Sequence, residues 1–387
     1  MKMFRQLMFG LVVTMSLALA GCGGGGGGGA TSNDLDGDGI PNAQDGFPND
    51  ATRFASFSVT QLTVPNNSLF SSAVDINTGR QVVGFSDTGS GQQEVRAQLW
   101  NVAVDGTTSA PVELSPIAGN TYSAAYGINE SRVVVGESSK AADTVAVFWP
   151  AGSATPTELQ LLSNVGPSAA YRISTAGRIV GEARNAGGNI VPVMWASTAA
   201  APEPLPLLSG GTKGAAYFIS ADGTKIVGES ENSSGKMRAV VWSVSVNGSV
   251  SSPDDLGILS GHDASTAFGI NSAGQIVGES ESATGETHAV IWTPGILFGY
   301  NIKDLSAAGA KASAAAISDA GLIVGWIDTT GSLASLWHAL NAENTTPPLS
   351  NSLSSSSNTS QALAVNSAGY VVGVSLDRAF VAAPTTP

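Results

Sequence analysis

A repeat of about 48 residues constrains the fold of this chain more than any other feature of its sequence. A Val-Val-Gly or Ile-Val-Gly triplet occurs seven times, and successive triplet glycines are 52, 45, 47, 50, 47 and 48 residues apart. These glycines are Gly84, Gly136, Gly181, Gly228, Gly278, Gly325 and Gly373. A period of this size corresponds to one supersecondary unit per repeat, and such units become stable only by packing on their neighbours.

Each unit carries the pattern of four short strands. In the fifth unit, the segment Ala267–Ile270 is followed by an Asn-x-x-Gly turn, by the triplet, and by an apolar run that ends in Trp292. The two runs around the turn predict a hairpin, and the run before the tryptophan predicts a third strand. The Leu-rich links between units, such as 255–259, predict a fourth strand. Tryptophan closes the first six units, at Trp100, Trp149, Trp195, Trp242, Trp292 and Trp337, and Ala379-Phe380-Val381 stands there in the seventh.

Four strands in a unit of this length predict a β-propeller blade. Residues 54–387 contain about 48 positions for each of seven blades. The seventh unit ends after its third strand, whereas residues 58–64 stand alone before the first unit and resemble the missing fourth strand. We therefore predict an all-β, seven-bladed propeller that is closed by pairing of this N-terminal strand into the last blade. A β-helix or an open stack of sheets is the competing architecture.

The composition excludes some classes of protein and partner. Hydrophobic residues make up 42% of the chain and charged residues only 12%, so the chain is not wholly disordered. The formal net charge of -13 argues against nucleic acid or an anionic membrane surface as a partner. We expect a monomer that does not bind nucleic acid.

The first 22 residues have the pattern of an export signal. Lys2 and Arg5 precede an apolar run at 7–20, which is too short to span a bilayer comfortably. The segment Leu19-Ala20-Gly21-Cys22 resembles the lipobox of bacterial lipoproteins. The resemblance implies cleavage before Cys22 and attachment of this residue to the membrane through acyl chains. An ordinary secretory signal with an incidental cysteine is the alternative reading.

A run of glycines separates Cys22 from the rest of the chain. Residues 23–29 are all glycine, which predicts a flexible tether with a reach of about 15 Å. Under the sorting rule of the lipoprotein family, glycine rather than aspartate after the cysteine implies the outer membrane of a Gram-negative source. We therefore expect an outer-membrane lipoprotein that faces the cell surface or the periplasm.

Residues 34–45 carry acidic side chains at calcium-binding spacing. Oxygen-bearing side chains occupy positions 1, 3, 5, 9 and 12 of this segment, with glycine at position 6. These are the offsets of a twelve-residue loop around Ca²⁺. Together with residues 46–50, the segment resembles a thrombospondin type 3 repeat. This resemblance implies Ca²⁺ as cofactor and, as ligands, Asp34, Asp36, Asp38, the carbonyl of Ile40, Asn42 and Asp45. A solvated acidic turn is the alternative.

These motifs divide the chain into four parts. We predict a signal peptide at 1–21, a lipidated cysteine and tether at 22–33, a calcium loop at 34–53 and the propeller at 54–387. The propeller units also resemble the bacterial HAF repeat family, through His288-Ala289-Val290 before Trp292. That resemblance implies an exported β-rich protein and transfers no catalytic residue.

Few residues suit catalysis. The three histidines, His262, His288 and His338, lie within or beside the repeat pattern, and no nucleophile motif accompanies them. Neither a carboxylate pair unique to one blade nor a cluster of arginines marks a glycosidase or sialidase site. We therefore expect that the chain is not an enzyme. A propeller enzyme that acts on extracellular polysaccharide is the alternative.

Units two to five share one departure from the other units. Glutamate follows the triplet glycine in these units, at Glu137, Glu182, Glu229 and Glu279. An aromatic residue also precedes the isoleucine of their first strand, at Tyr126, Tyr171, Tyr217 and Phe268. Equivalent positions of consecutive blades form an arc, and aromatic faces beside acceptor groups suit sugars or cationic peptides. The alternative is recent duplication of these units, with the aromatic side chains in the core.

These features together predict a cell-envelope lipoprotein with a calcium-binding loop. Its propeller would act as a binding or adhesion module for extracellular glycan or protein ligands. The alternatives are the enzyme described above and a scaffold subunit of an envelope complex.

Overall fold

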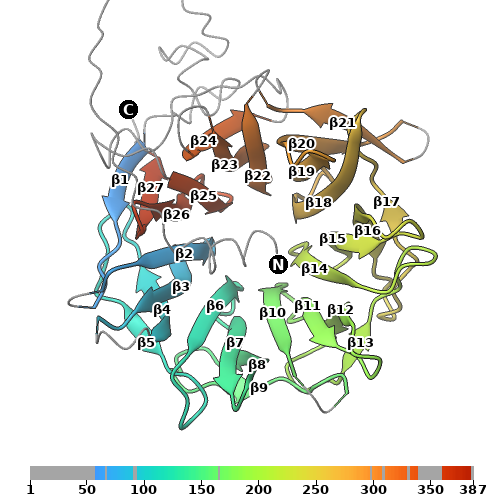
Figure 1. The fold of residues 1–387 in the computed structure, drawn as a ribbon. Coiled ribbons are helices and arrows are strands. Elements are labelled where there is room, and N and C mark those ends of the chain that lie inside the picture. The colour runs from blue at the N-terminus through green and yellow to red at the C-terminus, as the bar shows by residue number, and fades with distance from the viewer. Residues whose placement is uncertain are drawn as a thin grey trace, which may run out of the picture. The chain divides into compact units, whose positions relative to one another are not determined.

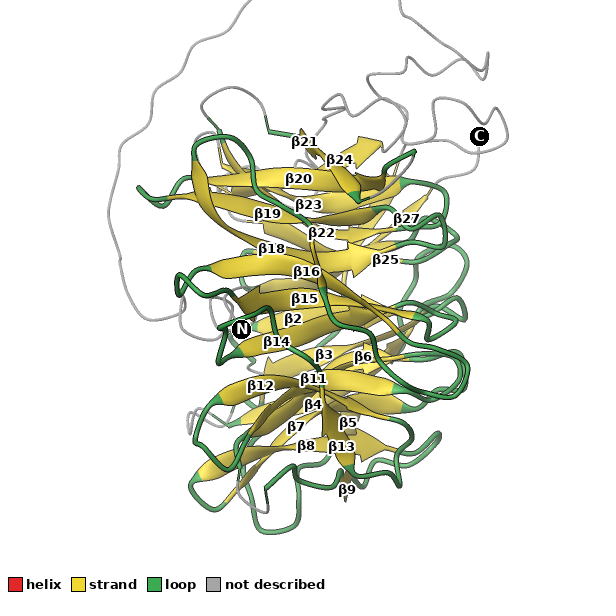
Figure 2. Ribbon diagram, turned by 90° about the vertical axis from the view of Figure 1, so that its right-hand side faces the viewer, coloured by secondary structure: helices red, strands yellow, loops and turns green. Residues whose placement is uncertain are grey.

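The structure is a computed structural model that describes residues 57–65, 68–89, 94–163, 166–296, 299–306, 310–328, 332–338 and 360–384. All regular structure in these ranges is β-strand, and Figure 2 shows only strands and loops there. These ranges therefore contain no helix that could cross a membrane. The strands form seven sheets arranged radially around a central axis, and we refer to the region around this axis as the channel (Figure 1). The prediction of a seven-bladed β-propeller is confirmed.

Blades 1 to 5 each contain four strands, which follow one another in chain order from the channel outward. Blade 1 consists of β2 (Ser71–Ile76), β3 (Gln81–Asp87), β4 (Val95–Asn101) and β5 (Val112–Leu114). Blade 2 consists of β6 (Ser123–Ile128), β7 (Val134–Lys140), β8 (Asp143–Trp149) and β9 (Thr157–Glu158). Blade 3 consists of β10 (Ser168–Ile173), β11 (Ile179–Arg184), β12 (Ile190–Trp195) and β13 (Pro202–Pro204).

The remaining blades follow the same plan. Blade 4 consists of β14 (Gly214–Ile219), β15 (Lys225–Glu231), β16 (Met237–Ser243) and β17 (Asp254–Asp255). Blade 5 consists of β18 (His262–Ile270), β19 (Ile276–Ser282), β20 (Thr287–Pro294) and β21 (Tyr300–Asp304). The described part of blade 6 consists of β22 (Lys311–Ile317), β23 (Leu322–Asp328) and β24 (Ser332–His338). Blade 7 consists of β25 (Ser360–Val365), β26 (Val371–Ser375), β27 (Arg378–Pro384) and β1 (Phe57–Gln61).

The ring closes as the sequence predicts. Strand β1 pairs antiparallel with β27, from Phe57 opposite Pro384 to Gln61 opposite Phe380. The first and last described strands of the chain thus lie side by side, blue beside red in Figure 1. This pairing protects the outer edge of β27, which would otherwise expose unpaired backbone groups.

The triplet glycine allows the two inner strands of a blade to approach closely. In blade 2, a Cβ atom on Gly136 would lie 2.0 Å from the carbonyl oxygen of Ala124. The register between β6 and β7 shifts at this point, so that Tyr126 is the extra residue of a β-bulge. The same bulge occurs in all seven blades, and its extra residues are Val74, Tyr126, Tyr171, Tyr217, Phe268, Ala315 and Leu363. The repeated glycine therefore reflects a repeated steric requirement.

The repeated asparagine links each blade that carries it to the next blade. Asn77 accepts a hydrogen bond from the backbone N–H of Gln81 at 2.9 Å, which closes the turn, and donates to the carbonyl of Asn129 at 3.2 Å. Asn366 of blade 7 donates in the same way to the carbonyl of Asn77 at 3.0 Å. This last bond joins the final blade to the first.

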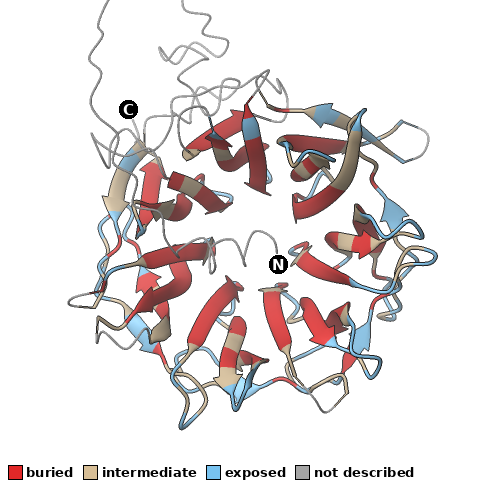
Figure 3. Cartoon of the chain, in the orientation of Figure 1, coloured by how far each residue is buried: buried red, intermediate tan, exposed pale blue. Residues whose placement is uncertain are grey.

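The six repeat tryptophans are fully buried in the blades (Figure 3 shows the burial of the strands). In blade 2, for example, Trp149 Nε1 donates a hydrogen bond to the carbonyl of Ser115 at 3.0 Å, in the segment that joins blade 1 to blade 2. The sequence placed the run Ala379-Phe380-Val381 at this position in the seventh blade, but the run ends one residue before it. The partner of Val371 is Ala382, whereas Phe380 lies opposite Gly373.

Candidate functional site

The channel has two ends, which the blades line with different side chains. We name the strands of a blade A to D from the channel outward. Because neighbouring strands are antiparallel, the turns between A and B and between C and D lie on one face of the propeller, which we call the AB face. The glutamates predicted from the sequence pair with the start of strand A, as Glu137 does with Ala124, and so lie towards the other face.

The four predicted aromatic residues form one continuous arc. The ring centroids are 5.8 Å apart from Tyr126 to Tyr171, 5.6 Å from Tyr171 to Tyr217, and 5.8 Å from Tyr217 to Phe268. Each ring belongs to the bulge residue of its strand A, and each residue is at most 6% exposed. The arc therefore forms part of the packed wall between blades. This agrees with the alternative interpretation, in which the aromatic side chains belong to the core.

Three of the four glutamates accept hydrogen bonds from tyrosines of this arc. Glu137 Oε1 accepts from the hydroxyls of Tyr122 and Tyr126, both at 2.7 Å. Glu229 accepts from the Tyr217 hydroxyl at 2.9 Å and from Thr266 Oγ1 of the next blade at 2.9 Å. The structure thus brings Glu137, Glu182 and Glu229 together with the tyrosines of the arc in a partly buried network. It adds Tyr122, which the repeat comparison missed because this residue precedes strand A in one blade only.

Burial shifts the ionisation of this network. Glu182 is only 8% exposed, and its pKa is raised to about 7, first by burial and further by the carboxylates of Glu137 and Glu229. A hydrogen bond from Tyr171 acts in the opposite direction. Burial and the carboxylate of Glu229 raise the pKa of Tyr217 well above its usual value. The network therefore contains a carboxyl group that titrates near neutral pH, and its role as a ligand site stays a prediction.

A cavity of about 330 Å³ opens at the other end of the channel, on the AB face. Its wall includes the residue that follows the bulge on strand A in most blades. In blade order these residues are Asp75, Gly127, Arg172, Phe218, Gly269, Ala316 and Ala364, of which Gly127 and Gly269 do not line the cavity. No other part of strand A varies so widely in chemistry from blade to blade. We call this hollow the AB cavity.

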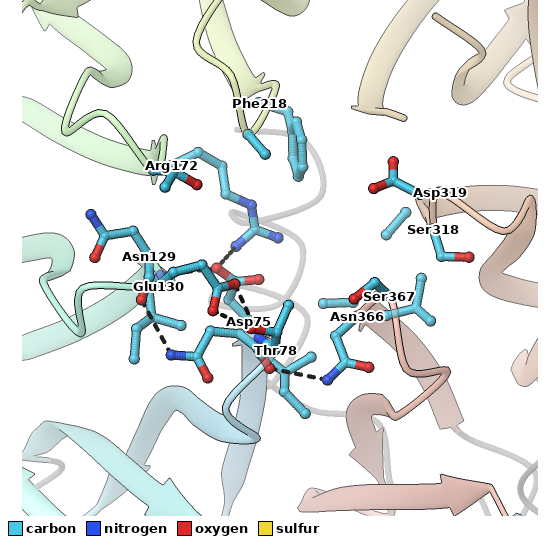
Figure 4. Close-up of a pocket in the computed structure, with 18 of the residues that line it drawn as sticks. Asp75, Thr78, Asn129, Glu130, Arg172, Phe218, Ser318, Asp319, Asn366 and Ser367 are labelled. Atoms are coloured by element: carbon cyan, nitrogen blue, oxygen red, sulfur yellow. Dashed lines mark hydrogen bonds and ion pairs between the residues drawn. The ribbon is translucent and has the colours of Figure 1, made fainter. Parts of the chain in front are cut away.

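An ion pair crosses one side of the AB cavity (Figure 4). Arg172 Nη1 lies 2.7 Å from Asp75 Oδ2, and the same nitrogen donates to the carbonyl of Tyr126 at 2.7 Å. The guanidinium carbon lies 5.2 Å from the centroid of the Phe218 ring, within the range of a cation–π contact. Burial raises the pKa of Asp75, and Arg172 and the N–H of Ile128 oppose this shift. Each charge of this buried pair is therefore compensated by the other, and removal of either one would leave an uncompensated buried charge.

Gly127 makes room for this pair in blade 2. A Cβ atom there would lie 2.9 Å from the carbonyl oxygen of Tyr171 and 3.1 Å from Cα of Arg172. Strand β10 therefore packs directly on the backbone of β6, and Arg172 reaches past blade 2 to blade 1. The sequence comparison overlooked this position, although its variation between units is the signal that could have found it.

The rim of the AB cavity is acidic. Besides Asp75, the lining carboxylates are Glu130, Asp222 and Asp319, and Arg172 is the only cation among the lining residues. Glu130 accepts hydrogen bonds from the N–H and the hydroxyl of Thr78. Asp222 accepts from Ser220 and Thr224 within its own turn. The described lining thus combines a buried ion pair, one aromatic ring and three exposed carboxylates.

The other sites predicted from the sequence are not tested by this structure. Cys22 and the calcium ligands of residues 34–45 lie outside the described residues. Among the residues that are described, no group of three or more His, Cys, Asp or Glu could hold a metal ion. Lipidation and calcium binding therefore stay predictions.

Two of the histidines lie together in blade 5. The ring centroids of His262 and His288 are 5.0 Å apart, and His288 Nδ1 lies 2.7 Å from Asp304 Oδ2. Arg238 of blade 4 pairs with Asp255 in the same way, between strands C and D. The His288–Asp304 contact thus occupies the same position in blade 5 as the Arg238–Asp255 pair in blade 4, and both contacts join strand D to strand C.

Comparison with solved structures identifies the same fold in other proteins. The chain is similar to YCF48 from Cyanidioschyzon merolae, with a TM-score of 0.50 and 12% identity over 84% of this chain and 98% of that one. It is similar to a prolyl endopeptidase, with a TM-score of 0.54 and 11% identity over 82% of this chain and 47% of that one. It is also similar to a puromycin hydrolase, with a TM-score of 0.53 and 14% identity over 81% of this chain and 53% of that one. No family model and no curated protein matches the sequence.

These likenesses correct one expectation from the sequence. The prediction that the chain is not an enzyme is wrong as an inference from the fold, because two of the matched proteins are hydrolases. The chain spans only about half the length of each of those two proteins. At such low identity the likeness shows the fold alone. It therefore shows that this fold occurs in enzymes, and it assigns no reaction to this chain.

Proposed function

We propose that this chain is an exported cell-envelope lipoprotein whose propeller is a binding module for an extracellular glycan or protein ligand. The ligand site in this proposal is the AB cavity. A propeller gathers turns from every blade around one opening, and its fold is compatible with such a role.

One observation carries the proposal. The positions that build the ring are repeated, as with the triplet glycine, the turn asparagine or serine, and the buried tryptophan. The strand A position at the AB cavity instead changes between acid, base, aromatic and small residues. A concave site of about 330 Å³ with a few convergent polar groups is typical of a ligand pocket.

The location and the calcium requirement are supported by the sequence. The lipobox-like segment at 19–22 supports membrane attachment through Cys22, on the outer membrane of a Gram-negative source. The acidic segment at 34–45 supports a Ca²⁺-bound loop between the tether and the propeller.

A variant that blocks the cavity mouth tests the binding site. Ala221 is exposed and lines the AB cavity, so Ala221→Trp should fill the opening without disturbing a buried contact. Ala320 is an exposed alanine in the equivalent turn of blade 6 that does not line the cavity, so Ala320→Trp is the matched control. Both variants and the full chain would be applied to arrays of envelope glycans and peptides, with and without Ca²⁺.

Binding that is lost in Ala221→Trp and retained in Ala320→Trp would support the proposal. Equal binding by both variants would place the ligand elsewhere on the propeller. Binding of no glycan or peptide on the arrays would contradict the assignment of a binding module for such ligands.

A further inference from the structure

The guanidinium of Arg172 is held in one orientation inside the AB cavity. Nη1 makes both of its polar contacts, to Asp75 and to the carbonyl of Tyr126, and the Phe218 ring covers one face of the group. The side chain is only 11% exposed. Its position is therefore set before any ligand arrives, which lowers the entropy cost of binding to it.

The other edge of this guanidinium has no partner among the residues that the structure describes. Within the described structure, neither Nε nor Nη2 donates a hydrogen bond. These two nitrogens form the parallel fork that fits both oxygens of a carboxylate. Neither nitrogen is among the buried side-chain atoms that lack a partner, so both are open to solvent and can bind a ligand carboxylate.

A carboxylate faces Arg172 from the opposite wall of the cavity. Asp319 of blade 6 points towards the cavity in Figure 4. Its Oδ1 accepts the backbone N–H of Ser272 at 2.8 Å, and its Oδ2 has no hydrogen-bond partner in the part of the chain that is described. A cationic group of a ligand could therefore bind at this wall while its carboxylate binds Arg172.

The charge balance excludes a simple anion. Four lining carboxylates oppose one arginine, so a ligand with only negative charge would be repelled by the rim. A ligand that also carries an ammonium group offsets this repulsion through Asp319. The lining thus favours a zwitterion over an acid or a neutral molecule.

The shape of the cavity limits the size of the ligand. Blades 5, 6 and 7 carry Gly269, Ala316 and Ala364 at the position that Arg172 and Phe218 occupy in blades 3 and 4. These small residues leave the volume of about 330 Å³ open, which suits a small molecule or the end of a chain. Phe218 offers the one aromatic surface of the lining to an apolar part of the ligand.

We infer that the AB cavity binds a free α-amino acid or a short unblocked peptide, with the carboxylate on the Nε–Nη2 edge of Arg172 and the ammonium group at Asp319. This inference rests on the proposed function, because it names the ligand class of the same cavity. A free amino acid and a short unblocked peptide both carry one carboxylate and one ammonium group, and the experiment separates them.

Calorimetric titration of the full chain would test the inference. The panel contains free amino acids, their N-acetyl and amide forms, and unblocked di- and tripeptides. We expect binding of at least one free amino acid or unblocked peptide, and at least about tenfold weaker binding of its N-acetyl or amide form. A difference in affinity between free amino acids and unblocked peptides would identify which of these two ligand classes the cavity prefers.

Two variants test the named contacts. Arg172→Lys keeps the positive charge beside Asp75 but removes the fork, and Asp319→Asn removes the charge at the other wall. Each should weaken binding at least about tenfold, whereas Asp254→Asn, at an exposed acid of β17, should leave the affinity unchanged. Circular dichroism would confirm that the variants are folded.

Two results would overturn the inference. One is that no member of the panel binds, and the other is that Arg172→Lys binds as tightly as the unchanged chain. If Ala221→Trp abolishes binding to an envelope ligand while no zwitterion binds, the inference alone fails. If that variant leaves envelope binding intact, the ligand binds elsewhere on the propeller and the AB cavity is not the site of the proposed function.

Discussion

Arg172 of blade 3 and Asp75 of blade 1 form an ion pair of 2.7 Å that reaches past blade 2. Both side chains are largely buried, at 11% and 14% exposure. The pair therefore joins blades that are not neighbours, and its geometry depends on the absence of a side chain at Gly127.

Breaking this pair on one side should destabilise the propeller. Arg172→Met leaves the carboxylate of Asp75 buried without its cation, and we expect a loss of about 3 kcal/mol in the free energy of unfolding. The double variant Asp75→Asn with Arg172→Met should recover most of this loss, because no buried charge is then left. Urea denaturation would measure both, and equal stability of the single and double variants would contradict the prediction.

Replacement of Glu182 should change how stability depends on pH. Its pKa in the folded chain is about 7, above the value of 4.5 for a free side chain, so the folded state binds the proton more tightly than the unfolded state. The contribution of Glu182 to stability is therefore fully present below about pH 4.5 and is lost as the pH rises through 7. Glu182→Gln should thus be more stable than the unchanged chain at pH 8, by roughly 2 to 3 kcal/mol, and similar to it at pH 4.

Thermal unfolding across this pH range would measure the difference. Glu203→Gln, at an exposed position of β13, is the matched control and should follow the unchanged chain at every pH. A constant offset for Glu182→Gln between pH 4 and 8 would show that the carboxyl group does not titrate in this way.

The triplet glycine should tolerate no side chain. Gly136→Ala places a Cβ atom 2.0 Å from the carbonyl oxygen of Ala124, so the inner strands must separate. We expect a loss of about 3 kcal/mol or more, measured by urea denaturation. Gly79→Ala is the control, because its nearest neighbour is the side-chain oxygen of Asn77 at 3.3 Å, and it should change stability by less than about 1 kcal/mol.

The acidic segment should bind calcium. We expect titration calorimetry of the full chain to show Ca²⁺ binding with a dissociation constant of about 10⁻⁴ to 10⁻³ M or tighter. Asp36→Ala removes a ligand near the centre of the loop and should abolish the event, whereas Asp254→Ala on the propeller should not. An absence of heat at millimolar Ca²⁺ would contradict the prediction that this segment binds calcium.

Membrane attachment should depend on the single cysteine. Cells that express the chain and are fed labelled palmitate should transfer the label to it, and the protein should sediment with membranes. Cys22→Ala should lose the label and leave the membrane fraction, because no other residue of the chain can accept the acyl chains in a lipobox-like signal. Labelling or sedimentation that persists in this variant would contradict the lipoprotein proposal.

The architecture could be predicted because its determinants are local. The triplet glycine, the Asn-x-x-Gly turn and the tryptophan recur at nearly constant spacing, and each acts within one blade or between adjacent blades. The strand at Phe57–Gln61 was also predictable, because the seventh unit contains only three strands. The run Ala379-Phe380-Val381 was placed one residue too early for the tryptophan position, since pairing register depends on the partner strand and not on the order of apolar residues alone.

The sites could not be predicted fully, because they are formed by contacts between blades that the spacing of residues along the sequence does not reveal. The repeat comparison identified the arc of glutamates and aromatic residues, but only the bulge geometry shows that Tyr126 and its equivalents turn into the wall between blades. Asp75 and Arg172 are 97 residues apart in sequence numbering, and nothing in either unit alone pairs them. The sequence by itself thus determined the number of blades, the closure and the elements of each blade, because these follow from local spacing. The tertiary structure decided which side chains meet in the channel, because that depends on how seven separate blades converge on one axis.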